Sequence, residues 1–194
     1  MDTIEAIKSR RSIRRYKPDP VDDKLLAVVL DAARWAPSWA NTQCWRFIII
    51  KDPDIKAEIA AALNSGNPAT KAILTAPIVI AACAELNKSG YHGDAKSTIK
   101  DNWYMFDVGL AMQNLVLAAH SLGLGTVHVG LFDIAKVESI LKIPPGFTIV
   151  EITPLGFRDT EGRAPPRKEL NEIVYKETFG EQYKFVDILP DKTL

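Results

Sequence analysis

The chain has 194 residues, 47% of them hydrophobic, and its 24 basic and 24 acidic residues give a formal net charge of zero. This composition is typical of a globular protein, and the length fits a single domain over residues 1–194. A zero net charge argues against nonspecific binding to nucleic acids or membrane surfaces.

The cysteine content and the start of the chain bear on the cell compartment. The sequence has only two cysteines, Cys44 and Cys83, and lacks the paired spacings of a disulfide scaffold or a zinc site. Its charged first residues do not follow the order of a secretory signal. A cytoplasmic protein is therefore expected.

The first half of the chain predicts three helices and two strands. A short helix is expected over residues 2–9, with Ile4 and Ile7 on one face. A second helix, capped by Asp22 or Asp23, follows a loop and ends at Pro37. The apolar runs 45–50 and 78–84 suit strands, and residues 55–63 suit a helix between them.

The second half begins with a polar segment, residues 86–100, which has no clear period and is expected to be a surface excursion or lid. A long apolar helix follows from about residue 101 to 122, with Gly123 as its left-handed cap. Because this helix contains several polar residues, it is expected to lie inside the protein and not in a membrane. Further elements are predicted as strands over 126–129 and 148–153, and as helices over 134–141 and 170–174.

The order of these elements indicates the fold class. Helices and strands are mixed without regular β-α-β alternation. An α+β sandwich is therefore expected instead of a doubly wound parallel sheet.

A basic run near the N-terminus could bind phosphate. Arg10, Arg11 and Arg14 lie within five residues of one another, and Ser12 lies between them. Guanidinium groups bind phosphate oxygens in a bidentate fork, and a serine hydroxyl adds a short hydrogen bond. The alternative is a solvated basic turn, which the spacing alone favours.

A polar cluster occupies the loop between the second helix and the first strand. Ser38, Asn41 and Gln43 offer the donors and acceptors that a heterocycle or a polyol chain needs. Without other evidence, these residues are typical of an ordinary turn.

Other motifs in the sequence do not match known cofactor-binding, metal-binding or catalytic patterns. Gly123 and Gly125 follow a helix and precede a strand, which is the reverse of the order in a Rossmann fingerprint. The three histidines show no metal-ligand spacing, and His120 is better explained as a core residue. Because no acid-base or nucleophile constellation is visible, a cofactor that carries the chemistry is favoured.

The order of motifs along nearly the whole chain resembles the nitroreductase family of FMN-dependent oxidoreductases. The matching stretches are the Arg10–Arg14 run, Ala36-Pro37-Ser38 with Asn41, Gln43 and Trp45, the segment 107–115, Gly123-Leu124-Gly125-Thr126, Val129-Gly130, and Pro154-Leu155-Gly156 ahead of Pro166-Arg167-Lys168.

The resemblance implies a mostly antiparallel sheet flanked by helices, in an intertwined homodimer with FMN at the interface. The residues that it implies for the cofactor are Arg10, Arg11, Ser12, Arg14 and Arg167 near the phosphate and ribityl chain, Pro37, Ser38, Trp39, Asn41 and Gln43 from the other subunit, and Val129 and Gly130 along the redox edge. The tail after Phe179, including Tyr183, Phe185, Val186, Ile188 and Leu189, is expected to cross to the partner.

Two residues depart from the family pattern. Cys44 stands where proline is usual, and it is expected to pack and not to react. Trp39 stands where a small residue is common. It is expected either to line the acceptor pocket, where it would narrow the pocket or stack on a planar acceptor, or to pack at the dimer interface.

The implied activity is ping-pong transfer from NADH or NADPH, through FMN, to nitroaromatics or quinones, with no catalytic side chain. Within the same fold, dehalogenation, ene reduction and flavin fragmentation remain alternatives, as does a non-catalytic flavin or nucleotide binder. A nucleic-acid role for the basic run fits poorly with the zero net charge.

Overall fold

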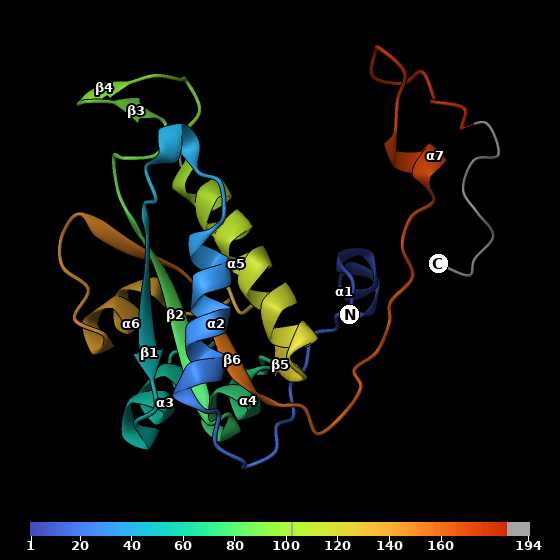
Figure 1. The fold of residues 1–194 in the computed structure, drawn as a ribbon. Helices are drawn as coiled ribbons and strands as arrows, with labels where there is room; N and C mark the ends of the chain where they lie inside the picture. The colour runs from blue at the N-terminus through green and yellow to red at the C-terminus, as the bar shows by residue number, and fades with distance from the viewer. Residues whose placement is uncertain (102, 186–194) are drawn as a thin grey trace. The chain divides into compact units, whose positions relative to one another are not determined.

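The computed structural model describes residues 1–101 and 103–185, and these form two compact units (Figure 1). The first unit is Met1–Gly162, and the second begins at Arg163. The single domain expected over residues 1–194 stays a prediction.

The first unit mixes helices and strands without regular alternation. In chain order its elements are α1 (Thr3–Ser9), α2 (Asp23–Arg34), the 3-10 turn η1 (Trp39–Asn41), β1 (Trp45–Ile50), α3 (Pro53–Ala60), α4 (Thr70–Thr75), β2 (Ile78–Glu85), β3 (Tyr91–His92), β4 (Ala95–Lys96), α5 (Trp103–Ser121), β5 (Leu124–Thr126), α6 (Ile134–Ile140) and β6 (Phe147–Phe157).

A four-stranded sheet forms the centre of this unit. Its strand order is β1-β2-β6-β5, and each neighbouring pair is antiparallel. Helices α2 and α5 pack on one face, and α3, α4 and α6 pack on the other (Figure 1). The predicted α+β sandwich is therefore confirmed.

The central strand β2 is buried on both faces, as its continuous apolar run requires. Ile80 and Ala82 join the core cluster formed with α2 and α5, whereas Val79 and Ala81 join the cluster formed with α3, α4 and α6. Successive side chains of a strand point to opposite faces, so one strand serves two cores. This arrangement holds the two helical layers to one sheet.

Caps fix where several helices begin. Asp22, one of the two predicted candidates, accepts the Lys24 N–H at 2.8 Å and caps α2. The helix predicted over 55–63 begins earlier because Asp52 accepts two N–H groups of its first turn and Pro53 suits that turn. Sequence periodicity could not place this start, since the apolar pattern begins only at Ile55, the third residue of α3.

The predicted strand over 126–129 was wrong in position. Gly123 has a φ of +80° and ends α5 as expected, and the chain enters the sheet directly at Leu124. Val129 forms only an isolated bridge, to Ile152. The sequence reading also missed α4, whose six residues are too short to show a helical period.

The polar segment 86–100 contains a small hairpin, β3 and β4, and so is a surface excursion. Helix α5 buries eight of its residues, from Asp107 to His120. Within the described ranges, no helix has both the length and the apolar character that crossing a bilayer requires.

Among its described residues, the second unit holds one short helix and one isolated β-bridge. Helix α7 (Leu170–Ile173) begins with a capping box of Glu169 and Glu172, and Tyr175 pairs with Gln182. Phe179 is 91% exposed in the isolated chain. Of the residues predicted to cross to a partner, Val186, Ile188 and Leu189 lie outside the described residues.

Candidate functional site

The basic run is fixed to the edge of the sheet. Ser12 forms a parallel bridge with Thr126, and the Ile13 N–H donates to the Thr126 carbonyl at 2.8 Å. Farther along, Tyr16 bridges to Arg158, and its hydroxyl donates to the Ile13 carbonyl at 2.6 Å. Two backbone bridges thus hold the segment between them in one conformation.

Gly125 makes this close approach possible. A Cβ at position 125 would lie 2.8 Å from the Ile13 Cβ, which is closer than carbon atoms approach in proteins. Lacking a side chain, Gly125 lets the basic run lie directly against β5. The Gly123-Leu124-Gly125 sequence therefore serves packing and helix termination, not dinucleotide binding.

A cavity of about 200 Å³ opens beside the basic run. It brings together three residues predicted for the cofactor site, namely Arg14, Val129 and Gly130. The other lining residues are Asn67, Pro68, Ala69, Val127, His128 and Leu131. Arg14 is exposed, and its guanidinium makes no hydrogen bond or ion pair with the residues that the structure describes.

The backbone distinguishes Val129 from Gly130. The Val129 N–H donates to the Ile152 carbonyl at 2.9 Å, and the reverse bond is 3.0 Å, so this amide is already satisfied. The Gly130 N–H has no partner among the described residues, and no atom would meet a Cβ there within 4 Å. Of the two predicted amides, only that of Gly130 can donate to a ligand.

Sequence reasoning missed Asn67, which lines the same cavity. Its Nδ2 donates to the Leu131 carbonyl at 3.0 Å, and its Oδ1 accepts the Ala69 N–H at 2.9 Å. The side chain thereby ties the turn before α4 to the segment that carries Gly130. The Asn67-Pro68 dipeptide signals a turn, but nothing in the sequence pairs it with Leu131.

The other predicted arginines have different surroundings. The Arg11 guanidinium donates to the carbonyls of Lys8 and Arg10, at 2.6 and 2.8 Å, and so binds the end of α1. Arg167 belongs to the second unit, where it donates to the Pro165 carbonyl. For both arginines, contact with a cofactor stays a prediction.

The loop of residues 37–43 is closely constrained. Both carboxylate oxygens of Asp107 lie 3.1 Å from the Trp39 nitrogen, and the Ser38 hydroxyl accepts the Gln43 N–H at 3.0 Å. Three non-glycine residues of this loop have a positive φ, namely Ala40 (44°), Asn41 (56°) and Gln43 (48°). Such backbone conformations persist only where surrounding contacts impose them.

Trp39 itself packs against another indole. Its ring centroid lies 5.1 Å from that of Trp103, the first residue of α5, and Trp103 meets Phe106 edge-on at 5.8 Å. Trp39 is half-buried, while Phe106 is 58% exposed. The cluster is partly exposed, and the location of Trp39 in an acceptor pocket or at a dimer interface stays a prediction.

Cys44 fits the packing role expected for it. Its side chain is fully buried, and its Sγ donates to Asp107 Oδ2 at 3.8 Å. Burial, with the nearby Asp107 charge, raises the pKa of the thiol to about 12. A thiol that stays protonated is a poor nucleophile.

The loop and the cavity lie at opposite ends of α5. The loop contacts the first turns of this helix through Asp107, whereas the cavity is lined by residues 127–131, which follow β5. In Figure 1, η1 and β5 lie at opposite ends of α5. A helix of 19 residues is about 28 Å long. Within one chain, the two groups of predicted residues therefore do not form one site.

Ser9 and His120 link α1 to α5, since the Ser9 hydroxyl lies 2.8 Å from His120 Nε2. Burial lowers the pKa of His120, and the positive charges of Arg158, Arg10 and Arg11 lower it further. The folded protein therefore favours the neutral imidazole.

This shift predicts a pH dependence of stability. A depressed folded pKa gives a contribution that is fully present above the ordinary value of 6.5 and is lost as the pH falls toward the lower folded pKa. Urea unfolding at pH 8 and pH 5 should show a larger loss of unfolding free energy for the wild type than for His120→Gln. Equal losses would contradict this prediction.

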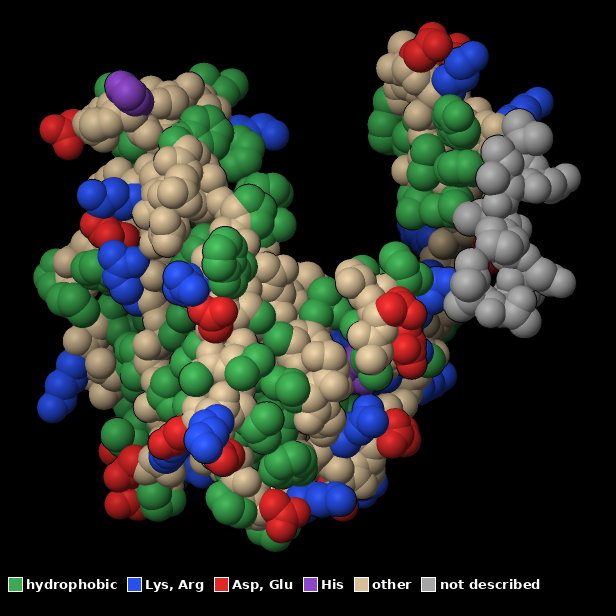
Figure 2. Space-filling view, viewed as in Figure 1, with side chains coloured by type: hydrophobic (Ala, Val, Ile, Leu, Met, Phe, Trp, Pro, Cys, Tyr) green, Lys and Arg blue, Asp and Glu red, His purple; other side chains and the backbone are tan. Residues whose placement is uncertain are grey.

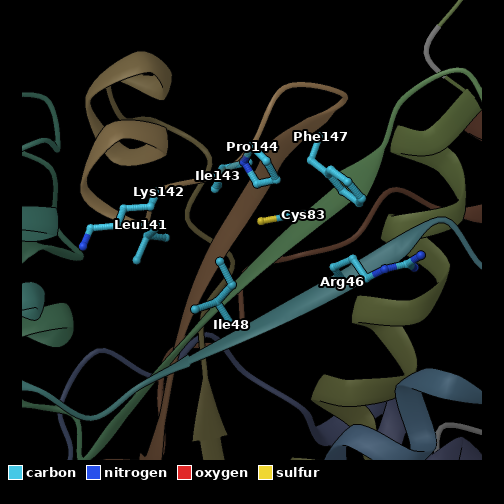
Figure 3. Close-up of a pocket in the computed structure, with 8 residues that line it drawn as sticks. All are labelled: Arg46, Ile48, Cys83, Leu141, Lys142, Ile143, Pro144 and Phe147. Carbon is cyan, nitrogen blue, oxygen red and sulfur yellow. The ribbon is translucent and has the colours of Figure 1, made fainter.

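A second cavity, of about 230 Å³, lies where β1 and β2 meet the segment after α6 (Figure 3). The Cys83 sulfur faces into it among mostly apolar neighbours, and burial together with the Glu138 charge raises the pKa of this thiol to about 11. None of the predicted site residues lines this cavity.

Comparison with known proteins identifies the class. The model of the nitroreductase family matches residues 7–157, so this chain belongs to that family, as the sequence motifs indicated.

Three relatives illustrate the range of the family. The chain is 29% identical over 200 residues to a protein from Thermus thermophilus named NADH dehydrogenase, covering 90% of this chain and 95% of the relative. It is 28% identical to 5,6-dimethylbenzimidazole synthase from Rhodospirillum rubrum, covering 87% and 88%. The solved structure of NADPH:FMN oxidoreductase from Vibrio harveyi, complexed with NAD+, matches with a TM-score of 0.78 at 25% identity, over 93% of this chain and 79% of that one.

Proposed function

We propose that this protein is an FMN-dependent oxidoreductase that takes reducing equivalents from NADH or NADPH and passes them to small acceptors such as nitroaromatics or quinones. The observation that carries the proposal is that Arg14 and Gly130 line one cavity, while neither the Arg14 guanidinium nor the Gly130 N–H has a hydrogen-bond partner among the described residues. The names of the Thermus and Vibrio relatives support the donor, and that of the Vibrio protein supports the cofactor.

The donor set suits FMN. Arg14 can bind a phosphate or another anionic oxygen, and the Gly130 amide can donate to a ring heteroatom at an open surface. Pockets for ligands of this size span about 300–1,000 Å³, so the cavity of about 200 Å³ is only part of a site. The loop of residues 37–43 from a second chain would complete it.

FMN, when bound, supplies the hydride chemistry, and the side chains bind and orient it. The Gly130 N–H would polarise the edge of the ring that it touches. The nicotinamide and the acceptor would use the same exposed face in turn, as in a ping-pong mechanism. No side chain is assigned as a general acid, because solvent can supply protons to the product.

An anaerobic titration tests the proposal. The purified protein should be yellow, release FMN in acid, and lose its visible absorption when NADH or NADPH is added. Colourless protein that also fails to take up added FMN would refute it, and bound FMN without bleaching would indicate a non-catalytic flavin binder.

The acceptor requires a separate comparison, because the Rhodospirillum relative is named for the synthesis of a benzimidazole. Steady-state turnover should be higher with nitroaromatics or quinones than with halogenated or ene acceptors. Turnover confined to the latter would favour another chemistry in the same fold. Consumption of FMN itself, with release of a benzimidazole product, would favour flavin fragmentation.

Gly130→Ala should lower the affinity for FMN without lowering the stability of the protein. An added Cβ would meet no protein atom within 4 Å, and the φ of Gly130 is not positive, so the melting temperature should be unchanged. A cofactor lying against this backbone would meet the new methyl group, so FMN affinity should fall by about tenfold. Equal FMN affinity in equilibrium dialysis would show that the cofactor does not approach Gly130.

The protein should be a homodimer. Hydrophobic side chains are exposed on the surface among interspersed charges (Figure 2). In the single chain, Ile4 and Ile7 of α1 are 56% and 50% exposed. Sedimentation should give twice the chain mass of 21.5 kDa. A stable FMN-loaded monomer would refute the prediction, and a variant truncated after Phe179 should dimerise more weakly if the tail crosses to the partner.

A further inference from the structure

Asp107 is the most deeply buried acidic side chain in the described part of the chain, with 1% of its surface exposed. It lies on α5 among the core residues that pack against the sheet and α2. A buried carboxylate is destabilising unless hydrogen bonds satisfy it. The hydrogen-bond donors to this carboxylate therefore indicate the role of Asp107.

The donors to Asp107 come from the segment that enters β1. The Trp39 N–H approaches both carboxylate oxygens at 3.1 Å, and the Cys44 thiol donates to Oδ2 at 3.8 Å. These two donors flank the loop, one near its beginning and the other just after its end. A single side chain thus fixes both ends of the strained stretch that contains Ala40, Asn41 and Gln43.

We infer that Asp107 is a positioning residue, which holds the loop of residues 37–43 in its strained conformation so that Asn41 and Gln43 are presented to the cofactor. The side chains of these two residues are exposed, and the Gln43 Nε2 donates to Asn41 Oδ1 at 3.2 Å. The presentation of Asn41 and Gln43 to FMN rests on the proposed function. The contact between Asp107 and the loop does not.

Cys44 gains a role from the same contact. Proline, which is usual here in the family, has no donor on its side chain, whereas the protonated thiol supplies one to Asp107. Burial and the Asp107 charge keep this thiol protonated, so that it remains a donor. Cys44 is therefore a second, weaker anchor of the loop.

The test compares Asp107→Leu with Asp107→Asn. Leucine matches aspartate in shape but accepts no hydrogen bond, and an apolar side chain suits the buried face of α5, so the protein should still fold although the Trp39 N–H loses its acceptor. Asparagine keeps an acceptor for the Trp39 N–H and should behave nearly as the wild type. Asn114→Ala, which removes a hydrogen bond from α5 to the Ala32 carbonyl, is the matched control away from the loop.

Hydrogen exchange of the protein without FMN gives the direct measurement. In Asp107→Leu, the amides of residues 39–43 should exchange about tenfold faster, whereas Asp107→Asn and Asn114→Ala should leave their rates unchanged. In the protein with FMN, Asp107→Leu should weaken cofactor binding or raise the KM of the acceptor by about tenfold, while kcat changes less.

The outcomes separate this inference from the proposed function. Unchanged exchange of the loop amides in Asp107→Leu would overturn the positioning role, whether or not the wild type binds FMN. Faster exchange in Asp107→Leu, with wild-type exchange rates in Asp107→Asn, would support the positioning role even if the wild type took up no FMN. In that case only the proposed function would fail. Faster exchange with unchanged FMN affinity and acceptor KM would overturn the presentation of Asn41 and Gln43 to the cofactor.

Discussion

Arg14→Ala should lower the affinity for FMN by about tenfold to a hundredfold. A hydrogen bond to a charged group contributes about 1.5–3 kcal/mol, and alanine removes the guanidinium without replacing it. Because Arg14 makes no hydrogen bond or ion pair with the described protein, the fold should be unaffected and the melting temperature of the cofactor-free protein unchanged. Fluorescence titration of the cofactor-free protein with FMN would measure the loss.

Arg15→Ala provides the matched control for charge. Arg15 is also exposed and adjacent in sequence, but it does not line the cavity, and its carbonyl still accepts the Asp159 N–H after the substitution. Its effect on FMN affinity should be small and should vanish at high salt. Equal losses in the two variants would mean that the basic run attracts the cofactor only by its overall charge.

Gly125→Ala should destabilise the protein and impair the site together. The added Cβ would lie 2.8 Å from the Cβ and the Cγ2 of Ile13, so the basic run would have to move away from β5. Overpacking of this kind typically costs about 1–3 kcal/mol of unfolding free energy. The bond from the Ile13 N–H to Thr126 would lengthen, and FMN affinity should fall because Ser12 and Arg14 move with it.

Urea denaturation measures the stability loss, and Gly130→Ala is the control because its Cβ has open space. Only Gly125→Ala should lower the free energy of unfolding, whereas both variants should lower FMN affinity. Wild-type stability in Gly125→Ala would show that Ile13 can shift at little cost. The packing role assigned to Gly125 would then be wrong.

The sequence by itself determined the family and most of the elements. β-branched and apolar runs gave β1 with its exact bounds and most of β2, because these patterns directly reflect burial in a sheet. The mixture of helices and strands without regular alternation indicated the α+β class. The family motifs agreed with it, since their order along the chain is specific although each one is weak. Gly123 was correctly expected to cap α5, because a left-handed φ there is a local property.

Only the tertiary structure decided which of these residues face one another. Arg14 and Gly130 are 116 residues apart, and they meet because Ser12 bridges to Thr126 and Val129 to Ile152. Asn67 was missed for the same reason, since its partner Leu131 is distant in sequence. The Asp107 contact to Trp39 spans 68 residues and depends on the packing of α5 beside the loop. Local patterns encode local conformation, whereas a binding site is made of contacts between distant segments.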